Sequence, residues 1–234
     1  MSITENTLSL RMRAVFDAVE PCEVLCDVGC DHGYVSIALA KAGIAKKVLA
    51  CDVNKGPLDC ASENIKSEGL SDRIECRLSD GLHNITTTDA PDCIVIAGMG
   101  GRLMKRILSE GLSVMSTTTQ LVLQPQSEGF LIRQWIRENG YHIVSEKMVE
   151  DAEKFYWIID ARMGRADTGK TEEQDIFDQY SEYLIKKKDE VLKEYLENQI
   201  YVNQGYLNGI SNESSEKLIK KIEHLKRALD LMKM

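Results

Sequence analysis

The sequence lacks the features that would send a protein into or through a membrane. No apolar run approaches the roughly 20 residues that a membrane-spanning helix needs. The first residues contain no basic start followed by an apolar block, so we expect no secretory signal and a cytoplasmic protein. Positive charge is scarce, because 29 Lys and Arg face 37 Asp and Glu, a formal net charge of −8. This balance argues against indiscriminate coating of nucleic acid or anionic membranes, although it is compatible with a local basic patch.

Paired cysteine motifs are absent too. The seven cysteines contain no CxxC, the tight spacing that zinc ribbons and most iron–sulfur sites use. Their number is odd, and several lie within apolar runs such as VLCDV and DCIVIAG, as reduced cysteines of a hydrophobic core do. We therefore expect neither a disulfide framework nor a metal site.

What the sequence does contain, over residues 1–163, is an alternation of short apolar runs with amphipathic stretches. Runs rich in Val, Ile, Leu and Cys suit strands that are buried on both faces of a parallel sheet. Helices between such strands imply right-handed βαβ units. Seven strands are predicted at 24–28, 47–52, 74–78, 93–97, 120–123, 141–146 and 155–161, with helices at 34–42, 57–68, 101–110 and 128–139.

The last two predicted strands are joined only by residues 147–154, a link too short for a helical crossover. We therefore expect them to be an antiparallel pair at one edge of the sheet. An open α/β sheet that ends in an antiparallel strand resembles the Rossmann-like sheet of class I S-adenosylmethionine (SAM) methyltransferases rather than the ordinary dinucleotide fold.

The tail of the chain, residues 172–234, is polar and charged and contains no strand-like run. Its second half carries an a/d seam typical of a coiled coil. A helix over about 172–201 is predicted before it, with a turn at 203–209. We predict a domain at 1–163, a linker at 163–170, and an antiparallel helical hairpin at 172–234. The seam consists of Leu218, Ile222, Leu225, Leu229 and Met232.

The first glycine turn, DVGCDHG, is the most informative motif for a cofactor. Gly29 permits a sharp turn after the first strand, and Gly33 permits close packing of the next helix; both could also be ordinary turn and packing glycines. A dinucleotide fingerprint needs a glycine between them, where the backbone approaches a pyrophosphate. Here that position is Asp31, whose carboxylate would repel a pyrophosphate and attract the ammonium or sulfonium of SAM.

Two further acids follow strands of the predicted sheet. Asp52 ends the second strand, where a carboxylate can accept hydrogen bonds from both ribose hydroxyls, and Asp80 follows the third, where it suits an adenine amino group. Ligands of open α/β sheets bind at these strand ends. Asp52 could instead cap a helix, Asp80 could be an ordinary loop residue, and His32 could be a structural histidine.

The loop after the fourth strand reads AGMGG, from Ala97 to Gly101. Amino-methylating enzymes of this class carry an [Asn/Asp]-Pro-Pro-aromatic motif there, which is missing. The glycines would let the backbone approach a flat ligand, or could form a plain turn.

Together these motifs resemble one family, the bacterial tRNA (adenine(22)-N1)-methyltransferases. The resemblance rests on LSLRMRAVFDAV, DVGCDHGY, CDVN, SDGL, AGMGG, LVLQPQ and the tail hairpin. It implies SAM as the methyl donor and N1 of a tRNA adenine as the acceptor. It also implies a contact of Arg11 with cofactor or RNA. The residues that it implies for the cofactor pocket are Asp27, Gly29, Asp31, Gly33, Asp52, Asp80 and Gly98.

Adenine N1 carries a lone pair at neutral pH, so the implied reaction needs alignment more than a strong base. Asp31 is a candidate for stabilising charge during transfer, Tyr34 or His32 for stacking on the flipped base, and Met99 is a further catalytic candidate. An RNA substrate requires local basic patches, at Arg11 and Arg13, at Arg133 and Arg137, and on the tail. A further patch is expected just after the reaction loop, at Arg102, Lys105 and Arg106.

Other functions stay open at this point. The chain could methylate another RNA atom or a small molecule, or bind SAM and RNA without turnover. An NAD-dependent oxidoreductase is disfavoured by Asp31 and by the antiparallel edge. We expect a monomer whose hairpin domain contacts tRNA.

Overall fold

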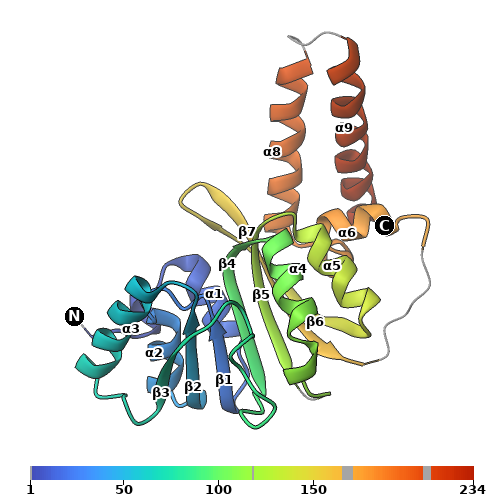
Figure 1. The fold of residues 1–234 in the computed structure, drawn as a ribbon. Coiled ribbons are helices and arrows are strands. Elements are labelled where there is room, and N and C mark those ends of the chain that lie inside the picture. The colour runs from blue at the N-terminus through green and yellow to red at the C-terminus, as the bar shows by residue number, and fades with distance from the viewer. Residues whose placement is uncertain (1, 118, 165–170, 208–211) are drawn as a thin grey trace. The chain divides into compact units, whose positions relative to one another are not determined.

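The computed structural model of the chain describes residues 2–117, 119–164, 171–207 and 212–234. Contacts between residues divide the chain into two compact units, Met1–Asp167 and Thr168–Met234. The first unit contains a seven-stranded sheet, and the second consists of helices (Figure 1).

The sheet has the strand order β3-β2-β1-β4-β5-β7-β6. The first five of these strands are parallel, and β7 pairs antiparallel with both β5 and β6. This confirms the predicted α/β sheet and its antiparallel edge. The strands are β1 (Cys22–Val28), β2 (Ala45–Asp52), β3 (Ile74–Leu78), β4 (Cys93–Gly100), β5 (Gln120–Ser127), β6 (Tyr141–Asp151) and β7 (Lys154–Met163).

Helices cover both faces of the sheet (Figure 1). One hydrophobic cluster contains side chains of α1, α2 and α3, and the other contains side chains of α4 and α5. Successive residues of the central strands enter opposite clusters, because side chains alternate between the faces of a strand: Val95 joins the first cluster and Ile96 the second. The helices are α1 (Leu10–Ala18), α2 (Tyr34–Lys41), α3 (Lys55–Ser67), α4 (Gly101–Glu110) and α5 (Gly129–Glu138), with short 3₁₀ turns at Glu5–Thr7 and Leu112–Val114.

The link between the last two strands differs from the prediction. Most of residues 147–154 belong to the strands themselves, and only Ala152 and Glu153 form the turn. Both have positive φ, 50° and 61°, the conformation that a tight two-residue hairpin requires. Neither is a typical residue of such turns, which is why the sequence did not reveal it.

The second unit contains four helices among the described residues, α6 (Gln174–Tyr180), α7 (Glu182–Lys187), α8 (Glu190–Leu207) and α9 (Asn212–Lys233). The single helix predicted over 172–201 is wrong, because the chain breaks it at Ser181 and Lys188, where φ is 71° and 54°. The Ser181 hydroxyl accepts a hydrogen bond from the Leu184 N–H and starts α7, as N-cap residues do.

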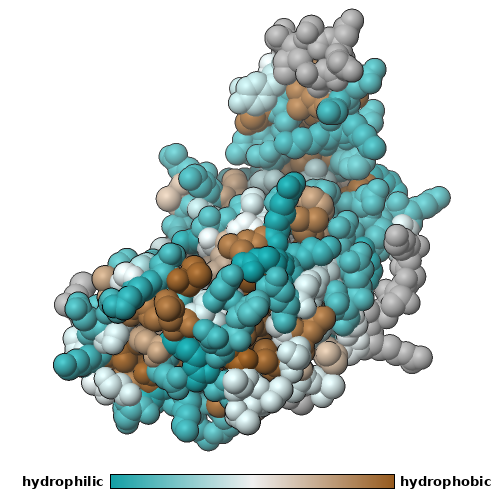
Figure 2. All heavy atoms as spheres, viewed as in Figure 1, coloured by the Kyte–Doolittle hydropathy of each residue, from teal (hydrophilic) through white to brown (hydrophobic). Residues whose placement is uncertain are grey.

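The predicted hairpin is formed by α8 and α9 (Figure 1). Of the predicted seam, Ile222, Leu225 and Met232 are buried. The predicted turn at 203–209 is partly wrong, since α8 continues through Gly205 to Leu207. Gly209 and the predicted linker residues 165–170 lie outside the described residues. None of the described helices is long and apolar enough to cross a membrane, and in the view of Figure 2 hydrophobic residues are interspersed among hydrophilic ones.

Candidate active site

The first glycine turn follows β1 at the carboxyl end of the parallel strands. The N–H groups of Gly29 and Cys30 donate hydrogen bonds to the Cys51 carbonyl, at 2.8 and 2.9 Å, and so tie the turn to β2. Gly29 has φ of +74°, and a Cβ there would collide with Cε of Met99. The positive φ favours glycine at this position, and the end of the Met99 side chain, from the reaction loop, occupies the space beside it.

Asp52 joins the glycine turn to the end of β2. Its Oδ2 accepts a hydrogen bond from the Asp31 N–H at 3.2 Å, and its Oδ1 accepts one from the Asn54 N–H at 2.8 Å. A carboxylate has about four lone-pair positions, so two remain for a ligand. The side chain of Asp31 is exposed, and its φ of 51° lies in a region that Asp tolerates better than most residues.

Asp27 lies beneath this turn and is buried. Its Oδ2 accepts a hydrogen bond from the Ser36 hydroxyl at 2.6 Å, which joins β1 to α2. Burial raises the pKa of Asp27 to about 6, the Ser36 hydrogen bond opposes this, and the charge of Asp52 adds to it. The carboxylate thus faces α2, and its predicted place in the cofactor pocket stays a prediction.

Asp80 is placed at the carboxyl edge as predicted but is paired within the protein. Its carboxylate accepts hydrogen bonds from the guanidinium of Arg106, the shorter of them at 2.8 Å. These hydrogen bonds lower the pKa of Asp80 below its usual value. The two residues were predicted to contact different ligands, adenine and RNA, and the structure brings them together.

The loop predicted at residues 97–101 is instead the end of β4, which continues through a β-bulge to Gly100 and leads directly into α4; we keep the name reaction loop for these residues. Ala97 pairs with Gln124 and Met99 with Pro125, so that Gly98, with φ of +77°, has no partner on β5. Its N–H instead donates to the side-chain Oε1 of Gln124 at 3.0 Å. Because Pro125 has no N–H to leave unpaired, it suits the irregular register.

Arg11, from α1, reaches the same loop. Its Nη1 donates to Oε1 of Gln124 at 3.2 Å, and its guanidinium lies 5.1 Å from the ring centroid of Tyr156. The Arg11 N–H donates to the carboxylate of Asp151 at 3.1 Å. The β6–β7 hairpin therefore holds α1 beside Gly98.

His32 and Tyr34 stack on one another at the start of α2, with ring centroids 5.8 Å apart. The Tyr34 side chain is half exposed, at 49%, so a second ring could reach it. His32 also lies 3.7 Å from the carboxylate of Asp31.

Similarity to known proteins identifies the family of this chain. A profile of the methyltransferase domain family matches residues 8–159. The tRNA (adenine(22)-N(1))-methyltransferase of Bacillus subtilis is 32% identical over 165 residues, which are 70% of this chain and 69% of that protein. The chain belongs to this family.

Solved structures show that the similarity covers almost the whole chain. Sp1610 of Streptococcus pneumoniae, a candidate tRNA (m1A22) methyltransferase, is 32% identical and superposes with a TM-score of 0.87 over 95% of this chain and 100% of that one. The same protein in complex with S-adenosyl-L-methionine gives a TM-score of 0.85 at equal identity and coverage.

The residues at the carboxyl edge of this methyltransferase fit SAM. Asp27, Asp31 and Asp52 gather negative charge around the turn, and the exposed Asp31 carboxylate stands where a pyrophosphate would need bare backbone. A sulfonium compound that carries a ribose matches these negatively charged acceptor groups, whereas a diphosphate does not.

The basic residues expected to contact RNA on α1 and after the reaction loop have acidic or polar partners. Arg13 pairs with Asp17, and Arg102 pairs with Glu128, both on exposed surface. The remaining pairs after the reaction loop are Lys105 with Glu138 at 4.0 Å and Arg106 with Asp80 and Glu110. The loop region is therefore less positive than its sequence indicates.

The prediction of a basic patch at Arg133 and Arg137 is wrong for Arg133. Its side chain is buried, 2.5 Å from the Glu146 carboxylate and over the ring of Trp157. A buried guanidinium requires such a partner, and this pair joins α5 to β6 instead of facing solvent.

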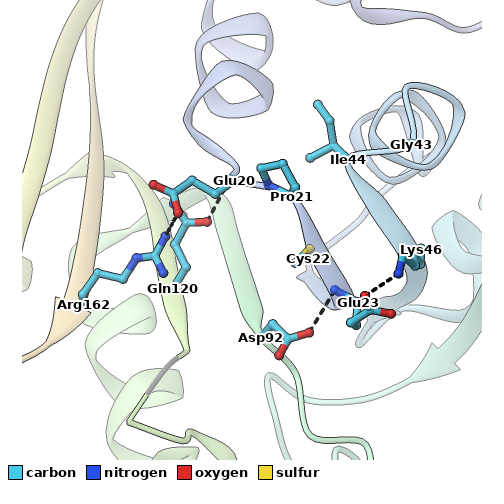
Figure 3. Close-up of a pocket in the computed structure, with 10 residues that line it drawn as sticks. All are labelled: Glu20, Pro21, Cys22, Glu23, Gly43, Ile44, Lys46, Asp92, Gln120 and Arg162. Atoms are coloured by element: carbon cyan, nitrogen blue, oxygen red, sulfur yellow. Dashed lines mark hydrogen bonds and ion pairs between the residues drawn. The ribbon is translucent and has the colours of Figure 1, made fainter.

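A cavity of about 510 Å³ opens at the amino ends of the strands, where β1 and β2 begin (Figure 3). The charged side chains that line it already have partners within the protein. Glu20 pairs with Arg162 and Glu23 with Lys46, and the Asp92 carboxylate accepts hydrogen bonds from the N–H groups of Glu23 and Val24. Because it lies away from the glycine turn and the reaction loop, it is not the active site.

Three residues at the active site, Gln124, Gln126 and Tyr156, have roles that the sequence alone did not reveal. Gln124 and Gln126 lie in the LVLQPQ motif, which carried the family resemblance without an assigned function. Tyr156 lies in a strand whose register places it beside Arg11, which only the three-dimensional fold reveals.

Proposed function

We propose that the protein transfers the methyl group of SAM to N1 of adenine 22 in tRNA. The main support for this proposal is a contact between the reaction loop and the first glycine turn, because Met99 of the loop lies against Gly29 of the turn. A base held on the reaction loop would thus meet a methyl group held at the turn.

SAM supplies an electrophilic methyl group bonded to a cationic sulfur. The N1 lone pair attacks that carbon, the carbon–sulfur bond breaks, and its electrons stay on sulfur, leaving S-adenosylhomocysteine and a cationic 1-methyladenosine. No proton must be removed before attack. The protein therefore acts mainly by alignment, which can supply roughly 7–11 kcal/mol of the barrier.

The chain's own residues divide this task. Asp52 binds the ribose hydroxyls, Asp31 attracts the cationic end of the cofactor, and Asp80, with Arg106, borders the adenine of the cofactor. The target base leaves its stack to enter the site, as base-modifying enzymes require, and Tyr34 offers a ring on which it can stack. Met99 closes the site between base and turn and excludes water.

The helical unit supplies further tRNA contacts in this proposal, and the protein works as a monomer in the cytoplasm. Its exposed lysines on α9 and the cations beside the reaction loop bind phosphates. The acidic total charge is then compatible with an RNA substrate, because phosphates are attracted locally.

Transfer of tritiated methyl from SAM to unmodified tRNA tests the proposal. We expect one methyl group per tRNA, recovered as 1-methyladenosine, and none on a transcript whose adenine 22 is replaced by guanine. Methylation of the replaced transcript would favour another RNA atom, and binding of SAM and tRNA without a gain in mass would identify a binding module.

A further inference from the structure

The two glutamines of the Gln124-Pro125-Gln126 segment have different surroundings. Gln124 is fully buried, and its amide is in use: Oε1 accepts from Arg11 and from the Gly98 N–H, and Nε2 donates to the Pro125 carbonyl at 3.2 Å. Gln124 therefore supports the reaction loop and has little capacity left for a ligand.

Gln126 is exposed at the end of β5. Its Nε2 lies 3.8 Å from the position that a Cβ of Gly98 would occupy, and Nη1 of Arg11 lies at the same distance. Gln126 and Arg11 thus flank the bare backbone of Gly98. Within the part of the chain that the structure describes, the side chain of Gln126 makes no hydrogen bond.

A free primary amide at this place matches one edge of adenine. If N1 is the methyl acceptor, N1 must face the methyl donor, and the edge that remains readable carries the N6 amino donor and the N7 acceptor. A glutamine amide pairs with these two atoms simultaneously, by accepting from N6–H and donating to N7. Guanine has acceptors at both positions, which one amide does not satisfy together.

We infer that Gln126 is the residue that selects adenine, by binding N6 and N7 of the target base while N1 stays free to attack. This inference rests on the proposed function. Arg11, held by Tyr156 and Gln124, lies as close to the Cβ position of Gly98 as Gln126 does and confines the base there.

The test uses two tRNA transcripts that differ at one atom. In the second, adenine 22 is replaced by 7-deazaadenine, which keeps N1 and N6 but replaces the N7 acceptor by C–H. For the native protein, kcat/KM should fall about tenfold on the deaza transcript, within the range of one lost base contact. For Gln126→Ala, kcat/KM should already be about that low on the normal transcript, and the two transcripts should react alike.

Two controls make the result specific. Ser127→Ala, a change at the next residue of β5, should keep the native preference for the normal transcript. Calorimetry should give Gln126→Ala the native Kd for SAM, which shows that the cofactor site is intact.

The possible failures are distinguishable. If Gln126→Ala still discriminates between the transcripts as the native protein does, or if the native protein does not discriminate, Gln126 does not read N7 and the inference is wrong while the proposed function stands. If the native protein forms no 1-methyladenosine on the normal transcript, the proposed function itself fails.

Discussion

The Asp27 carboxylate is a buried charge directly beneath the glycine turn, 5% exposed. Burial is the largest cause that raises its pKa, to about 6, against an ordinary value of 3.8. A carboxyl group with a raised pKa in the folded state stabilises the fold fully below its unfolded pKa, and this stability is lost as the pH rises through the folded pKa. The relevant window is therefore about pH 4–6.

Asp27→Asn removes this titration, so the free energy of unfolding of the variant relative to the native protein should rise between pH 4 and pH 7. A shift of about two pKa units corresponds to ~3 kcal/mol at most. Urea unfolding followed by tryptophan fluorescence reports on the first unit, because both tryptophans, Trp135 and Trp157, lie in it. A difference that stays constant with pH would contradict the assigned pKa.

Gly98 combines a positive φ with a place in the reaction loop. Gly98→Ala should destabilise the fold by roughly 1–2 kcal/mol, because L-residues disfavour this conformation. Its new methyl would also touch Arg11 and Gln126, where we place the target base. We expect kcat/KM for tRNA to fall at least tenfold, with the Kd for SAM near its native value.

Gly43→Ala is the matched control for this change. Gly43 has φ of +72°, but a Cβ there meets nothing within 4 Å. It should show a similar loss of stability with native kcat/KM. Equal losses of activity in both variants would mean that backbone strain alone explains the effect at Gly98.

Among the helices and strands, the sequence predicts best those whose formation depends on a single physical rule. The central strands of the sheet are short apolar runs buried on both faces, and their existence and parallel pairing were predictable. The break in the first tail helix was not, because Ser181 and Lys188 are not residues that usually end helices. The glycine turn was predictable from its spacing, whereas the role of Gln124 depends on a bulge that only pairing with β4 creates.

The turn of the β6–β7 hairpin carries backbone strain, since Ala152 and Glu153 both have positive φ. Asn-Gly is the preferred pair for such a turn. The double variant Ala152→Asn, Glu153→Gly should raise the free energy of unfolding by ~1–2 kcal/mol. Because Asp151 and Tyr156 keep their contacts with Arg11, kcat/KM should stay within twofold. An unchanged urea midpoint would show that the turn is not strained.

At the scale of the whole molecule, a net charge of −8 must coexist with an RNA substrate. Two groups of three cations are available. Arg102, Lys105 and Arg106 beside the reaction loop are each paired with acids. The second group, on α9, is exposed and has no ion pair with the described side chains: Lys217, Lys220 and Lys221.

Neutralising each group to Gln removes the same three charges, so a difference between the two triple variants cannot come from total charge. The slope of log K against log salt for tRNA binding falls by about 0.7–0.9 for each lost phosphate contact. We expect the slope to fall by about 2 for the α9 variant, because its lysines have no ion pair with the described side chains to break before they bind phosphates. The slope should fall by less than about 1 for the loop variant, because its cations are already paired with carboxylates of the protein.

If the α9 variant kept the native slope, the helical unit would not bind tRNA phosphates. A larger fall in the loop variant would instead mean that its acids are displaced when tRNA binds.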